Sequence, residues 1–272
     1  MEAKEIERLI KNGRDFCRMP KEDQDYKSDQ ELKKPQPPLF KAKMRNDYLK
    51  LPRDFSDLKI EKDFLKIINE RCSHRVYTEE PLSILELSYL LWCSQGVKSI
   101  RGKAYASIRT VPCGGARHEF ECYLAIHKVT GLKDGLYHYL PQFHAIEYLK
   151  EVENLPDFIS RSLGGQSWAN KANVVFYYSY VAYRSEWRYG IYSHRVVLID
   201  AGHITENVYL SATSINLGAC ALGYIDEEVL DEAFELDGQE EFMFYACPVG
   251  KISPQDKTKE DDFYAFVNQE NL

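Results

Sequence analysis

The sequence predicts an α+β protein with a mostly antiparallel central sheet flanked by helices. Apolar residues at helical spacing come first, strand-like stretches separated by short turn signals follow, and strand and helix patterns then alternate to the end. Helices and strands grouped in this way are typical of the class. With 272 residues, 44% of them hydrophobic, the chain is long enough to bury one sizeable core.

The first 59 residues differ from the rest because they are rich in Lys, Asp, Glu and Pro. We expect a short helix near residues 3–12 and then an extended arm that lies on the main domain. The charged start lacks the apolar stretch of a signal peptide. We therefore divide the chain into an N-terminal extension, a main domain and a C-terminal tail, over residues 1–59, 60–252 and 253–272.

Two helices open the main domain. Apolar residues at helical spacing predict the first over residues 60–70. Ser83 and Glu86 form an S-x-x-E capping box, which predicts a second helix that ends at Gly96.

Five strand-like stretches are rich in β-branched and aromatic residues, and Gly, Asp and Pro turn signals separate those in the middle of the chain. They lie at residues 121–129, 134–140, 144–150, 173–183 and 241–250.

Three further helical patterns lie among these strands. A short one falls near residues 155–163, and another follows Asp226 as its cap through residue 234. The long pattern over 186–217 has Gly190 and Gly202 as possible breaks and Gly218 as its expected end. Because it is apolar nearly all round, it belongs inside a core or at a subunit interface.

Charge and cysteine usage exclude several classes of protein. A net charge of -7 argues against nucleic-acid binding, for which a basic patch is typical. No apolar run is long enough to span a bilayer. Seven cysteines without a CxxC pair do not indicate a disulfide framework, and the histidines follow no zinc-binding spacing. The sequence favours a cytoplasmic protein with no metal and no nucleic-acid or membrane partner.

The first chemical motif is RCSHR at residues 71–75. In an extended segment the alternate residues Arg71, Ser73 and Arg75 lie on one side. Two guanidinium groups with a hydroxyl between them suit a phosphate or the acceptor-rich edge of a ring. The alternative is a pair of solvated surface arginines, since arginines are mostly exposed.

The second motif is the loop VPCGGARHEFEC at residues 111–122. Gly114 and Gly115 allow the backbone to approach a ligand closely, whereas the alternative is a plain turn before the next strand. A nucleophilic Cys113 requires a neighbouring base and an electropositive site. The other interpretation of Cys113 is a buried or loop-packing cysteine.

Three further stretches place polar groups or glycines where a ligand contact is plausible. Arg188 and Tyr189 are polar groups in otherwise apolar helical surroundings. Gly223 lies in an apolar loop, where the backbone can come close to a flat ligand. Gly250 and Lys251 end the last strand, a common place for ligand contacts.

Taken in order along residues 60–252, these motifs resemble the flavin-dependent nitroreductase superfamily, and most of all its branch of SagB-type or thiazole/oxazole-forming dehydrogenases. The stretches that carry the resemblance are RCSHRVYTEEPLSILELSYLLWCSQGV, RTVPCGGARHEFECYLAIHKVTGLKDGLYHYLP, WRYG and DAGHITENVYLSATSINLGACALGYID. The resemblance implies a nitroreductase-like fold in a domain-swapped homodimer, with FMN at sites built from both subunits.

The resemblance also implies roles for individual residues. Arg71 and Arg75, with Ser73 between them, match the family's R-x-S-x-R motif, in which they contact the phosphate and the pyrimidine edge of FMN respectively. The other implied contacts are a loop that reaches the flavin of the partner subunit (Pro112, Cys113, Gly114 and Gly115), a loop that points a backbone N–H at flavin N5 (Leu222 and Gly223) and a phosphate contact (Gly250 and Lys251).

The implied activity is hydride transfer from NADH or NADPH to FMN and then to a nitroaromatic, quinone-like or other small acceptor, in ping-pong order. The alternative is oxidation of thiazoline or oxazoline rings in a modified peptide. The sequence contains no fingerprint that chooses between NADH and NADPH.

Two departures from the family pattern bear on this choice. Cys113 replaces the loop serine, and a thiol is a weaker hydrogen-bond donor than a hydroxyl. Arg188-Tyr189 replaces a Lys-Tyr pair implicated in proton removal by the azoline-oxidising enzymes, and arginine cannot readily act as a base. We therefore favour the reductase, with Arg188 and Tyr189 as the candidate catalytic residues. A scaffold subunit on a flavin fold, and a metal hydrolase or thiol enzyme built on Cys113, are the other open functions.

Overall fold

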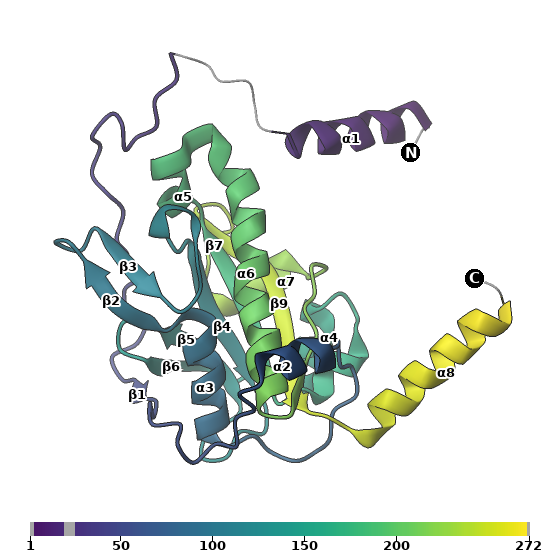
Figure 1. Cartoon of the computed structure of the whole chain (residues 1–272). Coiled ribbons are helices and arrows are strands. Elements are labelled where there is room, and N and C mark those ends of the chain that lie inside the picture. The colour runs from purple at the N-terminus through teal and green to yellow at the C-terminus, as the bar shows by residue number, and fades with distance from the viewer. Residues whose placement is uncertain (1–2, 19–24, 271–272) are drawn as a thin grey trace.

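A seven-stranded antiparallel sheet forms the centre of the molecule (Figure 1). The computed structural model describes residues 3–18 and 25–270. The strands of the sheet are β1 (Leu49–Lys50), β4 (Phe120–Ile126), β5 (Gly135–Leu140), β6 (Ala145–Lys150), β7 (Val174–Val181), β8 (Leu217–Ala219) and β9 (Glu241–Lys251). Their order is β1-β6-β5-β4-β7-β9-β8, and all neighbouring pairs are antiparallel. The predicted fold class is confirmed.

The helices are α1 (Ala3–Phe16), α2 (Phe64–Glu70), α3 (Ile84–Gln95), α4 (Leu155–Ser162), α5 (Ala182–Tyr189), α6 (Ser193–Ser214), α7 (Glu227–Phe234) and α8 (Pro254–Glu270). α3 begins with the predicted capping box, in which Ser83 Oγ accepts the Glu86 N–H at 3.1 Å. α7 begins with the predicted cap, since the Asp226 carboxylate accepts the Val229 N–H at 3.1 Å. Each such cap satisfies a backbone donor that the helix itself leaves without a partner.

Helices α3 and α6 cover one face of the sheet, and α4 and α7 cover the other (Figure 1). Leu87 and Leu90 of α3 share a core with Val208 of α6. Ile159 of α4 and Phe234 of α7 belong to a second core. Burying each side chain of this kind stabilises the fold by about 1.5–3 kcal/mol.

Strands β4 and β7 contribute side chains to both cores in strict alternation. Leu124 and Phe176 pack into the core beneath α6, whereas their neighbours Tyr123 and Tyr177 pack into the core beneath α4 and α7. Successive residues of a strand point to opposite faces, so a strand buried on both faces is apolar at most positions, with the buried Glu121 of β4 as an exception. This explains the almost continuous apolar stretch that β7 forms.

Helix α2 is shorter than the predicted helix over residues 60–70. Glu61 accepts the backbone N–H groups of Lys62 and Asp63 at 2.8 and 3.0 Å, and this stretch is irregular and not helical. Asp63 then caps α2 by accepting the Lys66 N–H at 3.1 Å.

The predicted helix over residues 186–217 is two helices. Gly190 ends α5 with a φ of 50°, and a Cβ there would lie 1.5 Å from the Tyr26 hydroxyl oxygen. Gly202 does not interrupt α6. Gly218 is not the end of the helix, because the chain has already turned to pair β8 with β9.

Four strands were not predicted, the two-residue β1 among them. β2 (Val97–Arg101) and β3 (Ala106–Arg109) form a separate antiparallel hairpin, and β8 has only three residues. Residues 98–101 of β2 are all exposed, so this strand lacks the alternation of apolar and polar residues that marks a half-buried strand.

The chain before α2 lies on the sheet as the predicted extended arm. β1 pairs with β6, and Lys41 donates its backbone N–H to Glu121 Oε1 at 3.0 Å. Met44 and Arg45 donate their N–H groups to the Glu147 carboxylate at 3.0 and 2.8 Å. Buried carboxylates of the sheet thus hold the arm.

The two terminal helices, α1 and α8, extend away from the sheet (Figure 1). The predicted helix near residues 3–12 is confirmed within α1, and α8 occupies most of the stretch assigned to a C-terminal tail. Among the described residues, no helix combines the length and the apolar character needed to cross a membrane.

Candidate functional site

The RCSHR segment runs from the end of α2 along β8. Arg71 closes α2 with extended backbone angles, and its N–H donates to Ile67 O at 2.9 Å. Ser73 forms a parallel bridge with Ala219, and the His74 N–H donates to Ala219 O at 3.0 Å. The segment is therefore extended, as the alternation of Arg71, Ser73 and Arg75 requires.

Tyr209 of α6 is the centre on which this segment converges. Its hydroxyl lies 3.1 Å from Ser73 Oγ and accepts the Ala221 N–H at 2.7 Å. The Arg71 guanidinium lies 5.3 Å from the centre of the Tyr209 ring. The sequence motifs gave no sign of Tyr209, although it joins the RCSHR segment to the loop after β8.

In the part of the chain that the structure describes, no carboxylate neutralises the cations of this segment. The Arg75 side chain is exposed and donates to Ser73 O at 3.4 Å. Among the described residues, no salt bridge includes Arg71 or Arg75. Two guanidinium groups without carboxylate partners, beside a hydroxyl, can hold an anion through charge-assisted hydrogen bonds.

The loop after β8 offers one backbone donor. Leu222 donates its N–H to Ala246 O at 2.7 Å, so that donor is already used. The Gly223 N–H donates to no described residue, and Gly223 is exposed. A Cβ at Gly223 would touch only Tyr245, at 3.8 Å, so the space around it is open. Of the two predicted residues, Gly223 is the one able to donate to a ligand.

The last strand ends beside the same segment, but its lysine is engaged. Lys251 Nζ lies 2.6 Å from Glu86 Oε1 and 3.9 Å from Glu80 Oε1. A Cβ at Gly250 would lie 2.9 Å from Asn173 Oδ1, so packing inside the chain is enough to require this glycine. An anion near Lys251 would have to compete with Glu86.

The glycine loop lies against a different part of the molecule. A Cβ at Gly114 would lie 2.6 Å from Val196 of α6, and one at Gly115 would lie 2.2 Å from Arg188 and 2.9 Å from the Tyr189 hydroxyl. The two glycines therefore let the loop pack tightly on α5 and the start of α6.

One chain does not bring the two groups of predicted residues together. The glycine loop is fixed to α6 at Asp200, whose Oδ2 accepts the Gly114 N–H at 2.8 Å. The RCSHR segment meets the same helix at Tyr209. Nine residues of α-helix span about 14 Å, so the chain presents two separate half-sites along α6.

Arg188 contacts parts of the chain that the motifs did not connect to it. Its guanidinium donates to Gln30 Oε1 at 3.1 Å and to the Tyr105 hydroxyl at 3.2 Å. Burial lowers the pKa of Arg188, but the hydrogen bonds and charges of Tyr189 and Tyr105 outweigh it and leave the pKa above its usual value. Arg188 is therefore a fixed cation beside Tyr189 and not a base.

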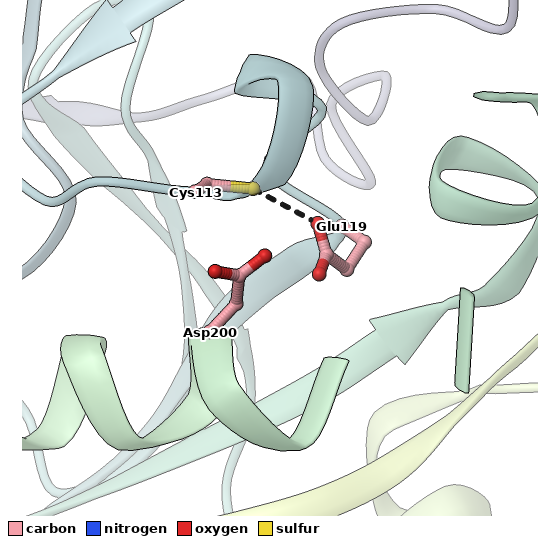
Figure 2. Close-up of side chains that lie close together, drawn as sticks. All are labelled: Cys113, Glu119 and Asp200. Carbon is pink, nitrogen blue, oxygen red and sulfur yellow. Dashed lines mark hydrogen bonds between the residues drawn. The ribbon is translucent and has the colours of Figure 1, made fainter. Parts of the chain in front are cut away.

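Cys113 belongs to a cluster with Glu119 and Asp200 (Figure 2). The thiol donates to Glu119 Oε2 at 3.1 Å and accepts the His118 N–H at 3.0 Å. Burial, and then the charges of Glu119 and Asp200, raise the pKa of Cys113 well above its usual value. A thiol that stays protonated is a poor nucleophile, which argues against a thiol enzyme built on Cys113.

The carboxyl groups of Glu119 and Asp200 lie close enough for their negative charges to repel each other. One ligand atom from each of the three side chains lies within 4.8 Å of the others, a spacing that could hold a metal ion. Burial and the charge of Asp200 raise the pKa of Glu119 to about 7. A shared proton lowers the repulsion between two buried carboxylates, so the cluster does not require a cation.

We expect this proton to make stability depend on pH. Because the pKa of Glu119 is about 7 in the folded chain against 4.5 ordinarily, the folded state holds more protons than the unfolded state between those values. The free energy of unfolding should fall on the order of 2 kcal/mol as pH rises from 5 to 8. Urea unfolding of the wild type and Glu119→Gln at several pH values measures this fall.

The variant should lose less stability over this range, because glutamine does not titrate. Glu151→Gln, at an exposed pair with Lys133, is the control and should follow the wild type. Parallel pH curves for Glu119→Gln and the wild type would contradict the assignment.

The sequence model of the nitroreductase family matches residues 68–251. A candidate nitroreductase of Methanocaldococcus jannaschii is 30% identical over 203 residues, which are 75% of this chain and 96% of that protein. The trifolitoxin-processing protein TfxB of Rhizobium leguminosarum bv. trifolii is 30% identical over 138 residues, 47% of this chain but only 36% of TfxB.

Solved structures show the same fold. The crystal structure of a candidate nitroreductase from Ralstonia eutropha superposes with a TM-score of 0.63 at 24% identity, over 81% of this chain and 96% of that chain. The family model covers more than half of the chain, and the M. jannaschii relative matches over nearly its whole length. The chain therefore belongs to the nitroreductase family.

Proposed function

We propose that this protein is an FMN-dependent oxidoreductase that uses NADH or NADPH to reduce nitroaromatic, quinone-like or other small acceptors. For a chain of the nitroreductase family, one structural observation supports this proposal most directly. The Ser73–Ala219 bridge brings two arginines without carboxylate partners next to the loop that ends in the unused Gly223 N–H.

These residues fit FMN by the chemistry of their donors. Arg71 and Ser73 would hold the phosphate, and Arg75 would face the acceptor-rich edge of the ring. The Gly223 N–H would donate to a ring nitrogen. Lys251 fits less well than the family pattern implies, because it already pairs with Glu86.

The chemistry that FMN supplies when bound is acceptance of a hydride from NADH or NADPH and its later transfer to a second substrate, in ping-pong order. A fixed cation at Arg75 stabilises negative charge that develops on a neighbouring group. Tyr189 is the hydroxyl we assign to positioning the second substrate or donating a proton, with Arg188 beside it as a fixed positive charge.

We further propose that two copies of the chain complete each site as a homodimer. The two half-sites on α6 lie about 14 Å apart along the helix, so neither Cys113 nor Tyr189 can join the Arg71 group within one chain. Leu198 and Ile199 of α6 are about half exposed, at 48% and 52%, as an interface helix requires. We also propose that the chain divides into an N-terminal extension, a main domain and a C-terminal tail at residues 59 and 252, and that the protein is cytoplasmic.

Steady-state kinetics test the proposed activity. Without oxygen, the purified protein loaded with FMN should oxidise NADH or NADPH continuously only when a quinone or nitroaromatic acceptor is present. Double-reciprocal plots at several acceptor concentrations should give parallel lines, the mark of a ping-pong order. Absence of acceptor-dependent oxidation with either nicotinamide would refute the reductase assignment.

A second function is favoured by the likeness to the trifolitoxin-processing protein. In this alternative the chain oxidises thiazoline or oxazoline rings in a modified peptide, with FMN as the acceptor. The cationic Arg188 argues against it, because it supplies no base beside Tyr189. A heterocyclised peptide that loses two hydrogens per ring by mass spectrometry would decide in its favour.

A further inference from the structure

The N-terminal arm crosses α5 next to the candidate catalytic residues. The Gln30 N–H donates to Trp187 O at 2.8 Å, and the indole N–H of Trp187 donates in turn to Lys34 O at 3.0 Å. Near the start of the helix, the Tyr183 hydroxyl donates to Asp29 Oδ2 at 2.8 Å. Both ends of α5 are thus tied to the arm, which fixes the side chains of the arm relative to the residues that end this helix.

Gln30, Tyr105 and Arg188 form a closed triangle of hydrogen bonds. Gln30 Nε2 donates to the Tyr105 hydroxyl at 2.8 Å. Arg188 Nη1 donates to Gln30 Oε1 at 3.1 Å and to the Tyr105 hydroxyl at 3.2 Å. Burial raises the pKa of Tyr105, but the hydrogen bond from Gln30 and the charge of Arg188 outweigh it and leave the pKa below its usual value. The arm and the β2–β3 hairpin thus hold the flexible Arg188 side chain in one orientation.

Arg117 brings a second positive charge to the same place. It is buried, with 3% of its surface exposed, and its Nε donates to Gly115 O at 3.0 Å. Its guanidinium lies 5.1 Å from the centre of the Tyr105 ring, and Gly115 packs directly on Arg188. Among the residues that the structure describes, no salt bridge includes Arg117 or Arg188. Two guanidinium groups without carboxylate partners therefore lie close to Tyr189.

We propose that Gln30 and Tyr105 are positioning residues that hold Arg188 for the carboxylate of an acidic acceptor, so that the site favours anionic nitroaromatic substrates. This inference rests on the proposed function, in which Tyr189 faces the second substrate. A guanidinium binds a carboxylate through charge-assisted hydrogen bonds, and binding is tighter when its orientation is fixed in advance. Both hydrogen bonds that hold Arg188 use Nη1, so the guanidinium keeps further N–H donors for a ligand.

A pair of matched acceptors measures this preference. Para-nitrobenzoate and para-nitrobenzamide share the ring and the nitro group, but only the first carries a charge. Each is supplied without oxygen to the FMN-loaded protein with NADH or NADPH, and kcat/KM for the acceptor is measured. In a ping-pong order this constant reports only the half-reaction with the acceptor, so recognition of the nicotinamide does not enter. The ratio of the two constants also cancels differences in flavin content between variants.

Four variants assign the preference to the triangle. Gln30→Leu and Tyr105→Phe should each lower the ratio of benzoate to benzamide about threefold or more, because Arg188 loses its fixed orientation. Arg188→Gln removes the charge and should lower the ratio about tenfold or more. Gln36→Leu is the matched control, since Gln36 lies on the same arm but donates to the backbone oxygens of Ala104 and Tyr105. It should keep the wild-type ratio.

Benzoate gives a second measurement, one without turnover. It has no nitro group to reduce, so the change in absorption of the oxidised flavin on titration with benzoate gives a dissociation constant. This constant should rise about threefold or more in Gln30→Leu and Tyr105→Phe. Gln36→Leu should bind benzoate as the wild type does.

The outcomes separate this inference from the reductase assignment. A protein that oxidises neither nicotinamide with any acceptor, a quinone included, refutes the assignment and this inference with it. If acceptors are reduced but Gln30→Leu and Tyr105→Phe leave both the ratio and the benzoate constant unchanged, the inference alone is overturned, even where kcat/KM for the nicotinamide falls. An equal loss in Gln36→Leu would also overturn it, because the effect would then come from a loosened arm.

Discussion

Replacing Arg71 and Arg75 together by alanine should weaken FMN binding by about a hundredfold or more. Each guanidinium that makes a charge-assisted hydrogen bond contributes about 1.5–3 kcal/mol, and every 1.4 kcal/mol changes a dissociation constant about tenfold. We expect the full loss of FMN affinity, because no carboxylate in the described part of the chain pairs with Arg71 or Arg75. Quenching of FMN fluorescence on titration with protein gives the dissociation constants of the wild type and of the double variant.

Two single variants set the scale for this result. Arg161→Ala removes an arginine whose exposed side chain pairs with Asp157, and it should leave FMN binding unchanged. Lys251→Ala should cost less than the double variant, because Lys251 is already shared with Glu86. Wild-type affinity in the Arg71→Ala/Arg75→Ala protein would show that the segment does not hold FMN.

Glu121→Ala should destabilise the fold by about 3–5 kcal/mol, the usual cost of breaking a buried ion pair. Glu121 is 1% exposed, and its Oε1 lies 2.5 Å from the Arg184 guanidinium and accepts the Lys41 N–H. His138 Nε2 lies 3.4 Å from its other oxygen. Removing the carboxylate leaves the buried Arg184 without this partner and removes one of the hydrogen bonds that hold the N-terminal arm, whereas His138 keeps Glu147 at 2.7 Å. Urea unfolding followed by far-UV circular dichroism measures the change.

The same ion pair predicts how acid acts on the fold. Burial raises the pKa of Glu121, but Arg184 and His138 outweigh it and hold the pKa far below its usual value. Stability from this group is complete above the ordinary carboxyl pKa and is lost as pH falls below it. Glu151→Ala, at an exposed pair with Lys133, is the control and should cost less than about 1 kcal/mol. A cost that small for Glu121→Ala would contradict the buried-pair interpretation.

The elements that sequence reasoning predicted are those whose signals are local. The capping box of Ser83 and Glu86, and the side-chain cap of Asp226, are visible within four residues and are present in the structure. Strand β8 carries no comparable signal, because its three residues are strand only through pairing with β9. The break at Gly190 was predicted as possible from the glycine itself, but its contact with Tyr26, a residue far away in the chain, was not.

In the candidate site, too, the residues that were predicted are those with a local signal. The alternation of Arg71, Ser73 and Arg75 follows from an extended segment, which the structure contains. Tyr209 lies 136 residues from Ser73 in the sequence, and only the packing of α6 brings them together. Likewise, no local pattern tells that Leu222 uses its N–H within the chain while Gly223 does not.

The visible absorption spectrum of the purified protein tests the central claim most directly. Recorded without oxygen after addition of FMN and removal of the excess, it should show flavin bands that travel with the protein. NADH or NADPH should then bleach these bands, and a quinone acceptor should restore them. A protein that retains no flavin, or whose flavin bands neither nicotinamide bleaches, would contradict the assignment of this chain as an FMN-dependent reductase.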